Sequence, residues 1–150
     1  MCGIAGFFGA GGEEAASKRL LTRMIGTISH RGPDGSGVYF DRGTGLAHAR
    51  LAIVDLGGGA QPMSSEDGEL TITFNGEIFN YVELREELKA RGAKFRTQSD
   101  TEVILHAYRA FGDVCVEKFN GDFSFAIYDK PRRRLFAARD RMGVRPFFYT

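Results

Sequence analysis

The alternation of hydrophobic and polar residues along the chain predicts a mixture of strands and helices. Leu70, Ile72 and Phe74 occupy every second position, the pattern of a strand with one buried face. Over residues 13–29 the apolar side chains instead recur every three or four positions, which predicts an amphipathic helix. In all, strands are predicted over residues 2–8, 37–40, 45–55, 69–74, 123–128 and 135–138, and an apolar, extended segment over residues 144–150.

Two further helices are predicted over residues 80–91 and 99–111. Asn80 and Ser99 each stand three residues before a glutamate, which is the pattern of a capping box at a helix start. Gly92 and Gly112 follow the predicted helix ends, where glycine commonly stops a helix. Because the strands are grouped and do not alternate strictly with the three helices, the pattern favours an α+β layered fold over a doubly wound parallel sheet.

Composition narrows the class of protein. The 150 residues are 43% hydrophobic and 26% charged, which fits one globular domain and excludes wholesale disorder. The formal net charge of +1 argues against nucleic acid or a membrane surface as partner, since both require a basic excess. No apolar run approaches the roughly 18 residues of a membrane span, and no basic segment precedes the apolar N-terminus as in a signal peptide. We therefore expect a cytoplasmic protein.

The two cysteines, Cys2 and Cys115, are too few for a disulfide framework, and no Cys/His cluster predicts a metal site. Cys115 lies beside a helical apolar pattern and is expected in the core. Cys2 would become the N-terminal residue if Met1 were removed, so that its α-amine could act as base for its own thiol. The alternative is that Cys2 is a small buried residue of the first strand, which position alone favours.

Asn75 and Gly76 also allow two interpretations. Asn-Gly is a strong signal for a hairpin turn, but the residues that follow are too few for a clear return strand before Asn80. The alternative is an oxyanion hole, in which the Asn75 carboxamide and the Gly76 N–H both donate to a developing negative charge. Glycine at this position would let the backbone approach a substrate closely.

Arg50 lies within a predicted apolar strand, where a guanidinium is costly unless it is paired. It would meet either an internal carboxylate or the carboxylate of a substrate. Asp100 has a structural alternative as a carboxylate in the first turn of a helix. Together, Arg50, Glu77 and Asp100 would suit an α-amino acid, because the arginine binds its carboxylate and the two acids bind its ammonium group.

These segments resemble the glutaminase domain of glutamine-hydrolysing asparagine synthetases. The resemblance is specific because its motifs keep their order and spacing along the whole chain. They are MCGIAG (1–6), HRGPD (30–34), RLAIVD (50–55), QP (61–62), NGEIFN (75–80) and SDTE (99–102), with further similarity over residues 121–129 and 139–147.

The resemblance implies an N-terminal-nucleophile hydrolase fold, a four-layer αββα sandwich of two antiparallel sheets. It implies that Cys2 attacks the side-chain amide of L-glutamine while Asn75 and Gly76 bind the oxyanion, so it favours the nucleophile interpretation of Cys2. Carried over residue by residue, it assigns substrate binding to Arg50, Leu51, Ala52, Ile53, Val54, Asn75, Gly76, Glu77 and Asp100.

The resemblance also implies a wider context. Residues 1–150 would be a type-2 glutamine amidotransferase domain, truncated at its C-terminus and without a cofactor of its own. Its ammonia would pass to a synthetase domain of the full-length chain, which uses ATP and Mg²⁺ to amidate aspartate. A homodimer is compatible with the resemblance. The alternatives are the same glutaminase half serving another carboxylate or sugar acceptor, and a catalytically silent binding module.

Overall fold

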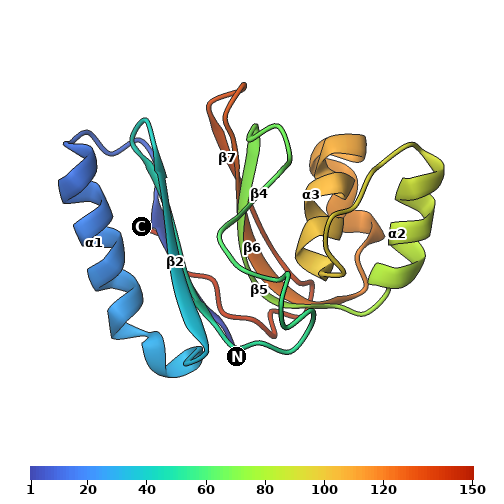
Figure 1. Ribbon diagram of the computed structural model, residues 1–150, viewed down its shortest axis with the longest axis horizontal. Coiled ribbons are helices and arrows are strands. Elements are labelled where there is room, and N and C mark those ends of the chain that lie inside the picture. Colours follow the sequence, from blue (N-terminus) through green and yellow to red (C-terminus); the bar gives the residue numbers. More distant parts are fainter.

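The computed structural model describes residues 1–150 and has four layers, in which two antiparallel sheets lie face to face between helices (Figure 1). Helix α1 (Glu14–Thr27) covers the outer face of one sheet, and α2 (Tyr81–Ala90) and α3 (Asp100–Phe111) cover the outer face of the other. This arrangement confirms the α+β class and the αββα sandwich. None of the three helices combines the length and the apolar character needed to cross a membrane.

The first sheet has the strand order β1-β3-β2 and places the N-terminus beside its central strand. Its strands are β1 (Gly3–Phe7), β2 (Gly35–Asp41) and β3 (Thr44–Arg50). Leu21 and Ile25 of α1 pack on Ala47 and Ala49 of β3, which are small enough to let the helix approach. The predicted amphipathic helix is therefore confirmed, and its apolar face forms this smaller core.

The second sheet has the order β4-β5-β6-β7, with every neighbouring pair antiparallel. Its strands are β4 (Met63–Ser64), β5 (Leu70–Ile78), β6 (Gly121–Asp129) and β7 (Arg134–Arg139). Leu70, Ile72, Phe74 and Ile78 of β5 belong to the main core of 17 buried residues beneath α2 and α3. Because side chains alternate along a strand, the residues between them face the first sheet.

Two predicted strand boundaries are wrong, and both errors lie beside the predicted site. Strand β5 does not end at Phe74 but continues through Asn75 and Gly76, which pair with Ser124 and Phe123 of β6. The hairpin interpretation of Asn75-Gly76 is therefore excluded.

Strand β3 ends at Arg50, whereas the apolar residues that follow predicted a strand as far as residue 55. Residues 51–55 form a loop because the side chains of Asp34 and Arg50 bind the backbone of these residues. The Asp34 carboxylate accepts the Ala52 N–H at 2.8 Å, and Arg50 donates to the Asp55 carbonyl at 2.7 Å.

Three further differences concern local structure. Asn80 precedes α2 but does not cap it, because its carboxamide bonds to the Lys118 carbonyl at 3.0 Å and the Asn120 N–H at 3.0 Å. Residues 144–150, predicted as extended, contain no strand. The elements not predicted are β4 and the 3₁₀ helices Ser29–Arg31 and Gly112–Lys118. Ser99, in contrast, caps α3 as predicted, since its side chain accepts the Thr101 N–H at 3.1 Å. The capping box is not completed, because Glu102 accepts the N–H groups of Arg96 and Thr97 instead of that of Ser99.

Candidate active site

One small cleft gathers almost all of the predicted site residues. It has a volume of about 70 Å³. It is lined by Cys2 from the N-terminus, Arg50 at the end of β3, the 51–59 loop, residues 74–77 of β5 and Asp100 at the start of α3. Of the predicted residues only Ala52 does not line it; its backbone N–H is bound to Asp34 instead.

Cys2 immediately precedes β1 and is half-buried, with its thiol against the backbone of Leu51. The Leu51 N–H donates to the sulfur at 3.4 Å, and the thiol lies 3.6 Å from the Leu51 carbonyl oxygen. On the other side, Arg31 Nε donates to the Cys2 carbonyl at 3.0 Å. The backbone and the thiol of Cys2 are thus both held by residues from other elements. Met1 precedes it and also lines the cleft.

Asn75 and Gly76 lie on β5 at the other side of the cleft. Asn75 is 3% exposed and lines the cleft. Gly76 has a φ of +150°, and a Cβ at this position would lie 2.1 Å from the Asp122 carbonyl oxygen of β6. Glycine is therefore required here both by the backbone conformation and by the close approach of β6.

The edge of β5 leaves the Gly76 N–H facing the cleft. In an antiparallel ladder consecutive residues point their N–H and C=O groups to opposite sides, so the even-numbered residues of β5 point away from β6. Strand β4 pairs only as far as Ile72, which leaves no strand beside Gly76. Two other even-numbered residues of β5 have side-chain partners on this edge. The Phe74 N–H donates to the side chain of Gln61, and the Ile78 N–H donates to the side chain of Asp100.

Glu77 and Asp100 place two carboxyl groups in the cleft. Asp100 is buried, and its Oδ2 accepts the Ile78 N–H at 3.1 Å. The pKa of Asp100 is raised from 3.8 to about 6, chiefly by burial and also by the nearby Glu77 carboxylate, while hydrogen bonds to backbone N–H groups oppose the rise. An ammonium group between the two carboxylates would offset this repulsion, so the pair suits a cationic ligand.

Arg50 does not meet an internal carboxylate as one interpretation of the sequence required. Its guanidinium donates to the backbone carbonyls of Asp55 at 2.7 Å and Leu56 at 3.1 Å. It thereby holds the 51–59 loop over the cleft. A Cβ at Gly59 would lie 2.7 Å from the Arg50 guanidinium, so glycine provides the space for it.

Several residues of the cleft were not predicted from the sequence, namely Met1, Gly59, Gln61, Phe74, Ser99, Thr101 and Arg145. Arg145 comes from the segment after β7, forms an ion pair with Asp122 at 2.9 Å and contacts the sulfur of Met1. Gln61 belongs to one of the motifs that carry the resemblance, which was the only sequence signal for it.

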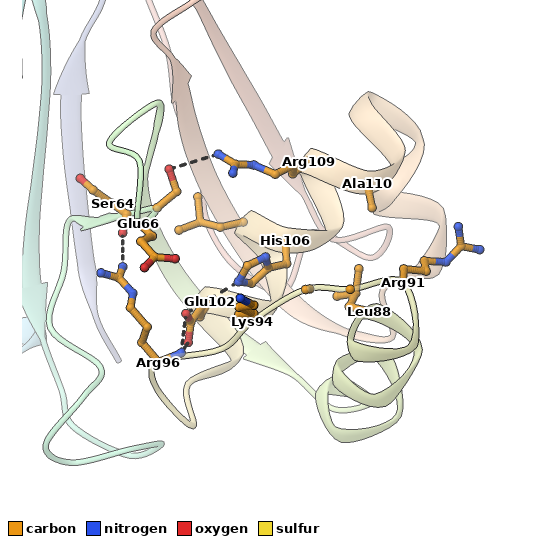
Figure 2. A pocket seen from close by; sticks show the side chains of 14 residues that line it. Ser64, Glu66, Leu88, Arg91, Lys94, Arg96, Glu102, His106, Arg109 and Ala110 are labelled. Carbon is orange, nitrogen blue, oxygen red and sulfur yellow. Dashed lines mark hydrogen bonds and ion pairs between the residues drawn. The ribbon is translucent and has the colours of Figure 1, made fainter.

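A larger cavity of about 390 Å³ lies apart from this cleft, between α2, α3 and the turn after β4 (Figure 2). None of the predicted site residues lines it. Two of its charged side chains are bound within the protein: Glu102 accepts the Arg96 N–H at 3.0 Å, and Arg109 pairs with Asp67 at 2.7 Å. No three His, Cys, Asp or Glu side chains group as a metal site requires, here or elsewhere. The cleft at Cys2 is therefore the candidate active site.

Comparison with known proteins agrees with this geometry. The family model described as a glutamine amidotransferase domain matches residues 1–150. Glutamine-hydrolysing asparagine synthetase 3 of Bacillus subtilis is 47% identical over 152 residues, and a probable glutamine-hydrolysing asparagine synthetase of Dictyostelium discoideum is 42% identical over 149. These alignments cover 100% and 99% of this chain but only 25% and 27% of the relatives, so the chain spans about a quarter of their length.

A solved structure shows the same fold. Glutamine phosphoribosylpyrophosphate amidotransferase of B. subtilis, complexed with ADP and GMP, superposes with a TM-score of 0.71 over 97% of this chain and 38% of its own. The sequence identity is 21%, so this similarity concerns the fold alone.

Proposed function

The chain belongs to the glutamine amidotransferase domain family, and we propose that it hydrolyses the side-chain amide of L-glutamine with Cys2 as the nucleophile. The observation that carries this proposal is the cleft itself. One small ligand could contact several groups there. They are the thiol of Cys2, the unpaired backbone N–H of Gly76, the guanidinium of Arg50 and the carboxylates of Glu77 and Asp100.

The first step requires a thiolate and a base. Removal of Met1 would leave the α-amine of Cys2 free beside its own thiol, and the amine would accept the thiol proton. The thiolate then attacks the δ-carbon of glutamine, forming a C–S bond while the carbonyl π electrons move to oxygen. The hydrogen bond from the Leu51 N–H to the sulfur stabilises the thiolate and holds it in place.

The negative charge on the tetrahedral intermediate would be bound by Asn75 and Gly76. Asn75 and Gly76 line the cleft from β5, and Cys2 lines the same cleft from the N-terminus. When the intermediate collapses, the C–N bond breaks and the nitrogen leaves as ammonia with the proton held by the α-amine. Water then attacks the γ-glutamyl thioester, the C–S bond breaks, glutamate is released and the thiol is regenerated.

The α-amino and α-carboxylate groups of glutamine, which share one carbon atom, would be bound side by side by the charged residues of the cleft. Glu77 and Asp100 bind the ammonium group, and an ionised Asp100 is required for this. Arg50 binds the carboxylate, either directly or by holding the backbone of Leu51, Ile53 and Val54 in the loop that its guanidinium organises. Both charges of the amino acid therefore find a partner of opposite sign.

We further propose that the ammonia serves a synthetase domain of a longer chain. The similar proteins are named glutamine-hydrolysing asparagine synthetases, and they are about four times as long as this chain. In that arrangement ATP and Mg²⁺ would act in the synthetase domain on aspartate, and the residues of this chain would supply only ammonia.

The test is ammonia release from L-glutamine by the 150-residue chain, with D-glutamine and L-asparagine as substrate controls. We expect release from L-glutamine alone and its loss in Cys2→Ala. Cys115→Ala is the matched control, because Cys115 is buried in the core and burial raises the pKa of its thiol to about 12. Equal ammonia release by Cys2→Ala and the unmodified chain would overturn the proposal.

A further inference from the structure

Phe74 directly precedes the residues of the proposed oxyanion hole. Its backbone N–H and C=O form hydrogen bonds with two side chains, and not with a neighbouring strand. Phe74 lies beyond the end of the β4–β5 pairing, so its N–H and C=O have no strand partner on that edge. Gln61 Oε1 accepts the Phe74 N–H at 2.7 Å. His48 Nε2 lies 3.0 Å from the Phe74 carbonyl oxygen.

The contact with His48 fixes the tautomer of that imidazole. A carbonyl oxygen only accepts hydrogen bonds, so Nε2 carries the proton and Nδ1 is unprotonated. Nδ1 is buried without a partner, which is less costly for a lone pair than for an N–H. His48 is completely buried, and this burial lowers the pKa of its imidazole to about 4, so it is neutral at physiological pH.

His48 links the two sheets at the level of the cleft. It is part of β3, where it pairs with Ile4 of β1, two residues after Cys2. Its bond to Phe74 of β5 therefore ties the strand that follows Cys2 to the strand that carries Asn75 and Gly76.

Gln61 connects the same peptide to the substrate-binding side. While its Oε1 accepts the Phe74 N–H, its Nε2 donates to Thr101 Oγ1 at 3.3 Å, next to Asp100. Gly37 of β2 makes its position possible, since a Cβ there would lie 2.2 Å from the Gln61 carbonyl oxygen. The carboxamide of Gln61, two residues before the start of β4 at Met63, thus substitutes for a strand peptide at a point of the β5 edge that β4 does not reach.

We propose that His48 and Gln61 are positioning residues that fix the Phe74 peptide and, through it, the Asn75 carboxamide and the Gly76 N–H. This inference rests on the proposed glutaminase function. Neither side chain needs to touch the reacting atoms: their role is to keep the oxyanion donors preorganised. A small displacement of such groups lowers the rate by up to about 10²-fold.

The test compares pairs of variants that differ in the hydrogen bond to Phe74. His48→Gln keeps a donor near the position of Nε2, and His48→Leu removes it. Gln61→Glu keeps an acceptor for the Phe74 N–H, and Gln61→Met removes it. Thr73→Val is the matched control, because the Thr73 hydroxyl also bridges the sheets, at 3.1 Å from the Ala47 carbonyl, but does not hold the Phe74 peptide.

We expect His48→Leu and Gln61→Met to lower kcat for glutamine about 10- to 100-fold with KM changed less than about threefold. Affinity for an aldehyde analogue of glutamine, which forms a tetrahedral adduct with a thiol, should fall in parallel with kcat, while affinity for glutamate stays the same. His48→Gln and Gln61→Glu should recover most of the activity, and Thr73→Val should keep the kcat of the unmodified chain whatever its thermal stability.

Folded His48→Leu and Gln61→Met proteins with kcat within twofold of the unmodified chain would overturn the inference and leave the proposed function intact. So would equal losses in kcat and in glutamate affinity. Amide hydrogen exchange over residues 72–78 provides a readout that needs no activity, with faster exchange expected in the two disruptive variants than in Thr73→Val. If the unmodified chain released no ammonia, the proposed function would fail, and unchanged exchange would overturn the positioning role separately.

Discussion

The Asp100 carboxylate accepts a hydrogen bond from the Ile78 backbone N–H at 3.1 Å. The first residue of α3 therefore binds the edge of β5 two residues beyond Gly76, on the same side as the open Gly76 N–H. Through this contact the group proposed to bind the ammonium of glutamine is fixed relative to the group proposed to bind the oxyanion. Substrate recognition and charge stabilisation thus share one strand edge.

The buried carboxylate of Asp100 should lower the free energy of unfolding at neutral pH. Burial raises its pKa to about 6, above the 3.8 of an ordinary Asp, so between these pH values the folded protein keeps a proton that the unfolded chain has lost. Its contribution to the free energy of unfolding therefore falls as the pH rises from about 4 to about 6 and stays low above that. Asp100→Asn should be more stable than the unmodified chain at pH 7.5, by roughly 1–3 kcal/mol.

Chemical denaturation at pH 3.5 and pH 7.5 measures this effect. The gain in Asp100→Asn should nearly vanish at the lower pH, where Asp100 is protonated in the folded state and mostly protonated in the unfolded chain. His48 has a lowered pKa and contributes a slope of the opposite sign, but it is present in both proteins and cancels in their difference. A gain of equal size at both pH values would show that ionisation of Asp100 is not its cause.

The same carboxylate predicts a pH dependence of substrate binding. Only the ionised form of Asp100 attracts an ammonium group, so kcat/KM for glutamine should rise with pH through about 6. Asp100→Asn should lose this limb of the profile and raise KM at least tenfold. Steady-state ammonia release between pH 5 and pH 8 tests it, and an unchanged KM in Asp100→Asn would contradict the assigned role.

Asn75 should contribute to the rate and little to substrate affinity. As a donor to the oxyanion, its carboxamide acts mainly in the transition state, so Asn75→Ala should lower kcat by about 10²–10³ with KM nearly unchanged. Asn80→Ala is the control, because its carboxamide bonds to Lys118 and Asn120 outside the cleft. That variant should lose stability while its kcat is retained; comparable losses of kcat in both variants would argue against an oxyanion role.

Gly76 should tolerate no side chain. A Cβ would collide with the Asp122 carbonyl oxygen, and a φ of +150° is strained for any other residue. Gly76→Ala is therefore expected to destabilise the fold by roughly 2–4 kcal/mol. Gly26 of α1 has open space around it, and Gly26→Ala should instead stabilise by about 0.5–1 kcal/mol. Thermal unfolding of the two variants should shift in opposite directions.

Cys2, Arg50 and Asn75 could be proposed as site residues from the sequence because each has a chemistry that stands out locally. A cysteine after the initiator, an Asn-Gly pair and an arginine beside an apolar run each allow a functional interpretation beside a structural one. That they meet in one cleft required the resemblance, since Cys2, Asn75 and Asp100 lie far apart in the chain.

The supporting residues could not be predicted in this way. His48 and Gln61 are identified by their hydrogen bonds to the Phe74 peptide groups. Those groups are free for side chains only because β4 begins at Met63, opposite Ile72, and does not reach Phe74. Local sequence patterns also gave wrong strand boundaries where contacts with distant residues determine the backbone conformation. Hydrogen bonds from the side chains of Asp34 and Arg50 hold the apolar residues after β3 in a loop. Pairing with β6 keeps the Asn-Gly pair of β5 in a strand, although this pair favours a turn.

The most direct test of the account is the intact mass of the chain after incubation with a thiol-reactive analogue of glutamine. The mechanism predicts that Met1 is absent and that one molecule of the analogue is attached, on the N-terminal peptide that carries Cys2. Excess L-glutamine should protect the site, and buried Cys115 should remain unmodified. An active protein that retains Met1, or one that is labelled elsewhere and spares Cys2, would contradict the central role of the N-terminal cysteine.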